Sequence, residues 1–82
     1  MLEFEPQGED YFVAEKYHEH FKCSIIYIIE KYSRPGLTAW EGRALSRHDI
    51  VAQCEMMPTF EDVEKWANHV SEEIDAGRLW QL

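Results

Sequence analysis

The sequence has few positive charges, few cysteines and no long apolar run. Eight Lys and Arg residues stand against sixteen Asp and Glu residues in a chain of 82, giving a formal net charge of −8. Such an acidic chain has little nonspecific affinity for nucleic acid or anionic lipid. The longest apolar run, residues 25–29, is far shorter than the roughly twenty residues that span a bilayer. We therefore expect no membrane segment, and direct binding of nucleic acid is disfavoured.

Motifs for catalysis and metal binding are also missing. The sequence contains no glycine-rich phosphate loop, nucleophile elbow or HExxH helix, so we do not expect an enzyme. His18, His20 and Cys23 are of metal-ligand type, but no second pair of Cys or His at zinc spacing accompanies them. We interpret both histidines as surface residues beside Glu19, and we expect neither a metal nor a cofactor.

Two cysteines, Cys23 and Cys54, occur in a chain whose acidic N-terminal residues include no apolar signal-peptide core. A reducing, cytoplasmic location is therefore expected. Both cysteines lie on apolar faces of predicted strands, where inert core thiols are favoured over a nucleophile.

The chain contains enough apolar residues for one small domain. They make up 45% of the sequence, which is an ordinary globular proportion. A domain of this length buries only roughly 60% of the surface that its unfolded chain exposes, so a partner or a second copy would add to its stability. We expect residues 9–82 to form a single small α+β domain. Residues 1–8, which include Pro6 and Gly8, are expected to form a flexible acidic arm.

The clearest predicted element is a long amphipathic helix over residues 60–76. Thr59 can cap its first amides, and Gly77 is suited to the left-handed residue that ends a helix. Apolar side chains recur at spacings of three and four and predict one buried stripe. The stripe consists of Phe60, Val63, Trp66, Ala67, Val70 and Ile74.

Alternating residues predict three strands upstream of this helix. The first covers residues 21–29, a turn of sequence Ser-Arg-Pro-Gly follows at 33–36, and the second covers 37–45. The third is expected at about 50–56, after a short polar connection. One face of the third strand would carry Ile50, Ala52, Cys54 and Met56, and the other Val51, Gln53 and Glu55.

Residues 9–20 fit two interpretations. Val13, Tyr17 and Phe21 follow a spacing of four, which favours a short helix, but residues 17–21 also fit an extended strand. With the short helix, the predicted architecture is α-β-β-β-α. This is an α+β fold in which a three-stranded antiparallel meander packs against the long C-terminal helix.

One helix covers only one face of such a sheet. The opposite face would carry Ile26, Ile28 and Tyr32, joined by Trp40 or its neighbours. Either the N-terminal segment folds back over this face, or part of it stays exposed for a homodimer or another protein. The sheet edges offer a third possibility, pairing with a partner strand. The row expected to face the helix is Phe21, Cys23, Ile25, Tyr27 and Ile29.

Residues 78–82 follow the predicted end of the helix and include Leu79, Trp80 and Leu82. They either fold back as a small clamp on the sheet edge or dock into a partner. Trp80 is the informative residue, because tryptophan is enriched among the residues that dominate binding energy at interfaces.

The negative charge is concentrated at the two ends of the chain. Residues 1–20 carry six acidic residues and one lysine, residues 59–75 carry the same numbers, and the stretch between them is nearly neutral. The predicted helix presents six acids outward, three of them in its last turns, where the helix dipole disfavours them. The candidate partner-binding residues are Glu61, Asp62, Glu64, Glu72, Glu73 and Asp75.

This acidic face predicts a non-enzymatic interaction module, an inhibitor or adaptor that binds a basic surface of another protein. Carboxylates on a rigid helix can imitate a nucleic-acid backbone, so the partner is expected to have a basic surface that binds nucleic acid. In size, acidity and sheet-plus-helix organisation the chain is similar to the small inhibitors that phages and mobile elements encode against host nucleases, anti-CRISPR proteins among them. This resemblance implies action in the host cytoplasm and assigns no residue roles. A merely solvated helix face is the alternative.

Two other functions stay open. A homodimeric structural or accessory subunit would use the apolar face with Ile26, Ile28 and Trp40, and Trp80 is a further candidate contact. A nucleic-acid-binding module would place cations on phosphates and stack aromatic residues on bases, although so few cations in an acidic chain make it the weaker candidate. Its residues would be Lys22, Lys31, Arg34, Arg43 and Arg47, with Tyr27, Tyr32 and Trp40.

Overall fold

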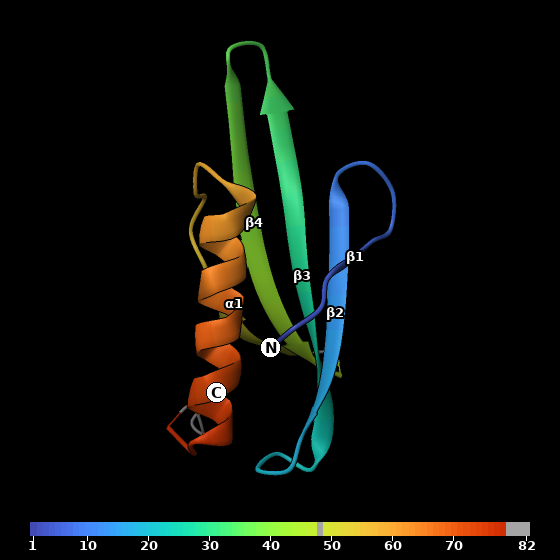
Figure 1. The fold of residues 1–82 in the computed structure, drawn as a ribbon, viewed down its shortest axis with the longest axis vertical. Helices are drawn as coiled ribbons and strands as arrows, with labels where there is room; N and C mark the ends of the chain where they lie inside the picture. Colours follow the sequence, from blue (N-terminus) through green and yellow to red (C-terminus); the bar gives the residue numbers. More distant parts are fainter. Residues whose placement is uncertain (48, 79–82) are drawn as a thin grey trace.

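A computed structural model describes residues 1–47 and 49–78. Within these residues the chain forms one antiparallel sheet in the order β1-β2-β3-β4-β5, followed by a helix (Figure 1). The α+β class is confirmed, but the predicted three-stranded meander with an N-terminal helix is wrong, because the sheet has five strands. The elements are β1 Glu5–Pro6, β2 Tyr11–His18, β3 Cys23–Arg34, β4 Leu37–Ser46, β5 Asp49–Gln53 and α1 Phe60–Asp75.

Strand β2 takes the place of the predicted N-terminal helix. It pairs with β3 from Tyr11 opposite Glu30 to His18 opposite Cys23. Two of its positions on the helix side of the sheet hold Lys16 and His18 rather than apolar residues. With polar residues at inward positions, the strand lacks the alternation of apolar and polar residues by which strands are recognised. The sequence pattern therefore favoured a short helix over a strand.

The N-terminal segment lies on the same side of the sheet as α1. Strand β1 opposes Phe12 and Val13 of β2, and the chain before it turns toward the helix, where Leu2 is buried in the core. The Leu2 backbone N–H donates to Asn68 Oδ1 at 2.8 Å. Figure 1 shows this segment leading from the neighbourhood of α1 to β1. The alternative in which it folds over the opposite face is therefore wrong.

The β3–β4 hairpin confirms the predicted turn. Strand β3 ends at Arg34 and β4 begins at Leu37, and these two residues oppose each other. Between them Gly36 has a φ of 76°, a backbone conformation that glycine adopts without steric cost. In Figure 1 the hairpin extends past the ends of β2 and α1.

A β-bulge between β4 and β5 changes which residues face the core. Ala44 opposes Ala52, but the next residue, Leu45, opposes Ile50. Val51 is the extra residue, and it is buried while Ile50 is exposed. A bulge interrupts the alternation of a strand, so the prediction that Ile50 and the alternate residues after it share one face is wrong.

Helix α1 confirms the predicted helix, its cap and its stop. Thr59 Oγ1 accepts a hydrogen bond from the backbone N–H of Asp62 at 3.1 Å, and Gly77 follows the last turn with a φ of 76°. In the part of the chain that the structure describes, no helix combines the length and the apolar character needed to cross a membrane. The fully covered apolar side of α1 consists of Val63, Ala67, Val70 and Ile74.

Strand β3 supplies the centre of the core, as predicted. Ile25, Tyr27 and Ile29 alternate along the strand, face α1 and are fully buried. The predicted match between this row and the apolar stripe of the helix is therefore confirmed.

Trp40 lies on the helix side of the sheet, so its neighbours, among them Ala39 opposite Tyr32, join the opposite face instead, and the choice of Trp40 as an apolar contact of that face is wrong. Trp40 opposes Lys31 on β3, and residues that oppose each other across two strands share a face. Its ring packs against Phe12 and Phe60, with centroid separations of 6.1 and 5.4 Å. Phe4 adds an edge contact to Phe60. These aromatic rings close the core where α1 begins.

Gly42 on β4 allows α1 to approach the sheet closely. A Cβ atom at this position would lie 2.6 Å from Val63 Cγ1 and 2.7 Å from Trp66 Cζ3. Both distances are shorter than van der Waals contact, so any larger residue would push the helix and the strand apart.

We predict that Gly42→Ala lowers the free energy of unfolding by about 1–3 kcal/mol, because overpacking a tight interface forces the backbone to shift. Urea unfolding followed by tryptophan fluorescence measures the change. Thr38→Ala, at an exposed position of the same strand, is the control and should change stability by less than about 0.5 kcal/mol. A free energy of unfolding equal to that of the wild type in Gly42→Ala would contradict the close packing of α1 on β4.

Candidate protein-interaction site

Two of the six predicted acidic residues are held by ion pairs inside the chain. Asp75 Oδ2 accepts a hydrogen bond from Lys16 Nζ at 2.7 Å, and the bond lowers the pKa of the Asp75 carboxyl. Glu73 accepts from Arg78 Nε at 2.8 Å, and its pKa is lowered for the same reason. Asp75 thereby joins the end of α1 to β2, whereas the Glu73 pair is local to the end of the helix. Both carboxylates are already paired with cations of the chain.

The other acids of α1 do not form a continuous array. Glu61 and Asp62 lie in the first turn, where the positive end of the helix dipole favours them. Glu64 and Glu72 have no ion pair among the described residues, but the exposed Lys65 lies between them on the helix. The helix alone therefore presents an interrupted row of charge.

The N-terminal segment brings further acids to the β2 edge of the sheet. Glu3 and Glu5 line a hollow with Glu15 of β2, and Glu64 and Glu72 line a second hollow. Both hollows are bordered by Met1, so they adjoin. We call these five residues, Glu3, Glu5, Glu15, Glu64 and Glu72, the acidic flank.

Sequence reasoning missed the acidic flank because its members come from both ends of the chain. A usable signal was present in the first residues, where Leu2 and Phe4 alternate with Glu3 and Glu5. Such alternation is typical of a segment with one buried and one solvated side. The position of that segment beside α1 depends on tertiary packing, and the local sequence pattern does not predict it.

The sheet face turned away from α1, which we call the outer face, is not covered by any described part of the chain. Ile26 is 37% exposed and Ile50 is 55% exposed, whereas Ile28 is only 7% exposed. Beside them Arg43 pairs with Glu30 at 3.1 Å. Of the predicted apolar contacts, Ile26 is accessible, Ile28 is mostly covered, Trp40 is on the other side, and Trp80 lies outside the described residues.

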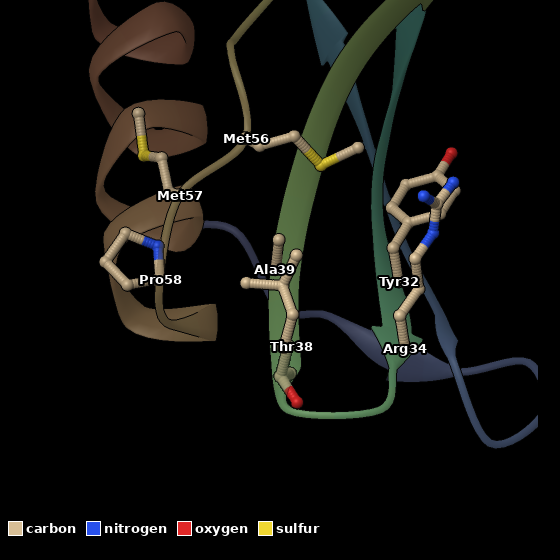
Figure 2. Close-up of a pocket in the computed structure, with 8 residues that line it drawn as sticks. Tyr32, Arg34, Thr38, Ala39, Met56, Met57 and Pro58 are labelled. Atoms are coloured by element: carbon tan, nitrogen blue, oxygen red, sulfur yellow. The ribbon is translucent and has the colours of Figure 1, made fainter.

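A further groove of about 430 Å³ lies between the hairpin tip and the segment after β5. Figure 2 shows Met56 reaching from that segment toward β4, with Tyr32 and Arg34 on β3. Leu37 and Met56 are both exposed. The groove is mainly apolar, with Arg34 as its cation, and it was not predicted from the sequence. The adjacent Met56 and Met57, just before a proline, were the available signal.

His18 is fully buried, so its predicted surface position is wrong. Its Nδ1 lies 2.8 Å from Asp75 Oδ1 and its Nε2 lies 2.7 Å from the Tyr27 hydroxyl. A carboxylate only accepts, so Nδ1–H donates to Asp75, and Nε2 is hydrogen-bonded to the Tyr27 hydroxyl. Burial raises the pKa of Tyr27 to about 12, which keeps this hydroxyl protonated. The network joins β2, β3 and the end of α1.

Cys23 opposes His18 across β2 and β3, whereas Cys54 lies after β5. Cys54 is buried, its Sγ accepts from the Gly42 N–H at 3.1 Å, and burial raises the pKa of its thiol. Cys23 is half-buried, with its Sγ 3.4 Å from Ser46 Oγ. Among residues 1–47 and 49–78, no three His, Cys, Asp or Glu side chains come together as a metal site.

The residues suggested for nucleic-acid binding do not gather on one surface. Tyr27 is buried in the core and Trp40 packs on the helix side, so neither joins Tyr32 on the outer face. Arg43 is paired with two carboxylates of the sheet, Glu30 and Glu41. Two of the three aromatic residues and one of the five cations proposed for this candidate are therefore engaged inside the fold.

Comparisons with protein-family models, curated proteins and solved structures find no match to this chain.

The Asp75 pairs give a testable dependence of stability on pH. Bonding to Lys16 and His18 lowers the pKa of Asp75 below 3.8, so its carboxylate stabilises the fold above that value, and the contribution is lost as the pH falls through the lowered pKa. We predict that Asp75→Asn is less stable than wild type at about pH 6 and that the difference vanishes toward about pH 2. Urea unfolding across this range measures it.

The matched control is Asp10→Asn, which removes an exposed carboxylate just before β2. It should leave the stability close to wild type at about pH 6, where Asp75→Asn is destabilised. A constant difference between Asp75→Asn and wild type at all pH values would contradict the ion-pair assignment.

Proposed function

We propose that the chain is a small protein-binding module, an inhibitor or adaptor, that docks its acidic flank on a basic surface of another protein. One observation carries the proposal. The packing of residues 1–4 beside α1 gathers the exposed acids of both chain ends on one flank, where the sequence alone had them far apart.

The charge balance of this flank favours a cationic partner. Its five carboxylates are accompanied by Lys16 and Lys65, and Lys16 is already paired with Asp75. A surface of one sign steers a partner of opposite sign and raises the rate of association. A cationic surface that normally binds nucleic acid is the partner that fits, which agrees with the resemblance to phage-encoded inhibitors and with action in the cytoplasm.

We predict that reversing flank charges weakens partner capture. The variant Glu3→Lys/Glu15→Lys/Glu72→Lys changes three exposed residues of the flank and should weaken binding of captured proteins by about tenfold or more, because like charges then face each other. Immobilised wild type and variant are compared in a cell lysate at several salt concentrations, with mass spectrometry of the retained proteins.

The matched control, Glu9→Lys/Glu19→Lys/Glu55→Lys, reverses three exposed acids outside the flank and has the same net charge. It should retain the partners of the wild type. Equal loss in both variants would show that net charge alone governs binding, and unchanged binding in the flank variant would overturn the proposal.

A homodimer through the outer face is the second candidate. The observation that favours it is the exposure of Ile26 and Ile50 on a sheet face that no described segment covers. Clustered apolar side chains on the surface of a small protein commonly mark a contact with another molecule.

For the homodimer we expect light scattering to give twice the chain mass of 9.7 kDa, and Ile26→Asp to return the protein to a monomer. Lys22→Asp, at an exposed site in the turn before β3, is the control and should leave the dimer intact. A monomer at every concentration of the wild type would exclude this candidate.

A further inference from the structure

The part of β2 that follows Val13 is an open sheet edge. Strand β1 opposes only Phe12 and Val13, so none of the described strands lies beside the remainder of β2 on that side. Figure 1 shows this part of β2 at the outside of the sheet. Open edges present unpaired backbone N–H and C=O groups, which is how sheets accept an additional strand.

The register identifies which backbone groups are free. Lys31 N–H donates to Asp10 C=O, so every second residue of β2, counted from Asp10, directs its backbone N–H and C=O groups to β3. The residues between them direct these groups away from β3, to the side of β1. Tyr11 confirms this, because its C=O accepts from Gln7 N–H at 2.7 Å on the β1 side. By the same alternation Glu15 and Tyr17 direct their N–H and C=O groups to the open edge, and both residues are exposed.

The N-terminal segment turns away from this edge and leaves free the position beside β2 where a further strand would lie. Were β1 extended backward, residue 3 would oppose Glu15, but Leu2 and Phe4 instead pack into the core with α1. What is left is a hollow of about 570 Å³ between residues 1–5 and residues 13–16. Its acidic lining residues are Glu3, Glu5 and Glu15.

We infer that an extended, basic segment of a partner protein adds as a strand to the open edge of β2, with its backbone on Glu15 and Tyr17 and its cations against Glu3, Glu5 and Glu15. This inference rests on the proposed function and specifies how the partner is held. Charge complementarity favours a basic occupant, because three carboxylates line this hollow. Lys16, which also lines it, is already paired with Asp75 at 2.7 Å.

The pleat of β2 also sets the pattern of the incoming segment. Residues opposite Glu15 and Tyr17 share their face of the sheet, the outer face, and the residue between them shares the helix side with Lys16. Cations are therefore favoured at alternate positions and disfavoured at the position facing Lys16. An inward lysine on an edge strand ordinarily discourages pairing, but the Asp75 carboxylate compensates its charge.

The test uses the full chain, labelled with ¹⁵N, and a capped octapeptide of alternating Lys and Thr. At low salt the backbone amides of Glu15 and Tyr17 should shift and gain protection from hydrogen exchange. Methylating the backbone nitrogens of the peptide lysines removes the donors aimed at β2 and should weaken binding about tenfold. A peptide with Glu in place of Lys should not bind.

Equal binding of the methylated peptide, or shifts that spare Glu15 and Tyr17, would overturn strand addition while leaving the acidic flank as a docking surface. Absence of binding by the Lys-Thr peptide would also overturn it. Glu15→Gln should weaken the peptide severalfold, and Tyr17→Phe, which keeps the backbone groups and the charge, should not. The proposed function fails separately, if charge reversal on the flank leaves partner capture unchanged.

Discussion

One helix and a short N-terminal segment together cover one face of a five-stranded sheet, and the other features of the molecule depend on this packing. A helix is about 10 Å across and strands lie about 4.8 Å apart, so α1 shields roughly two strands. It packs on β3 and β4, and Leu2 and Phe4 fill the remaining space. The residues that close the core thereby bring Glu3 and Glu5 to the β2 edge of the sheet, beside Glu15.

Much of the fold is predictable where local signals agree with tertiary packing. Helix α1 has a capping threonine, an apolar stripe and a terminal glycine, and the β3–β4 hairpin has an alternating pattern and a Pro-Gly turn. Strand β2 is not predictable in this way, because its inward Lys16 and His18 take part in a polar network completed by Tyr27 and Asp75. The bulge that turns Val51 inward also leaves no local signature.

The candidate site was predictable only as a surplus of negative charge. The sequence identified the six acids of the helix, but only the folded chain shows that Asp75 bonds the end of α1 to β2 and that Glu73 pairs locally with Arg78. Conversely, Glu3, Glu5 and Glu15 gain importance through contacts between segments distant in sequence. Ion pairs and long-range packing depend on three-dimensional proximity, which composition and periodicity do not report.

Zero-length coupling of carboxylates to partner lysines tests the account most directly. The wild-type chain is bound to a captured partner, treated with a carbodiimide, and the linked peptides are identified by mass spectrometry. The account predicts links through residues of the acidic flank, above all the exposed Glu3, Glu15 and Glu72. Links confined to exposed acids elsewhere, such as Glu9, Glu19 and Glu55, would contradict it.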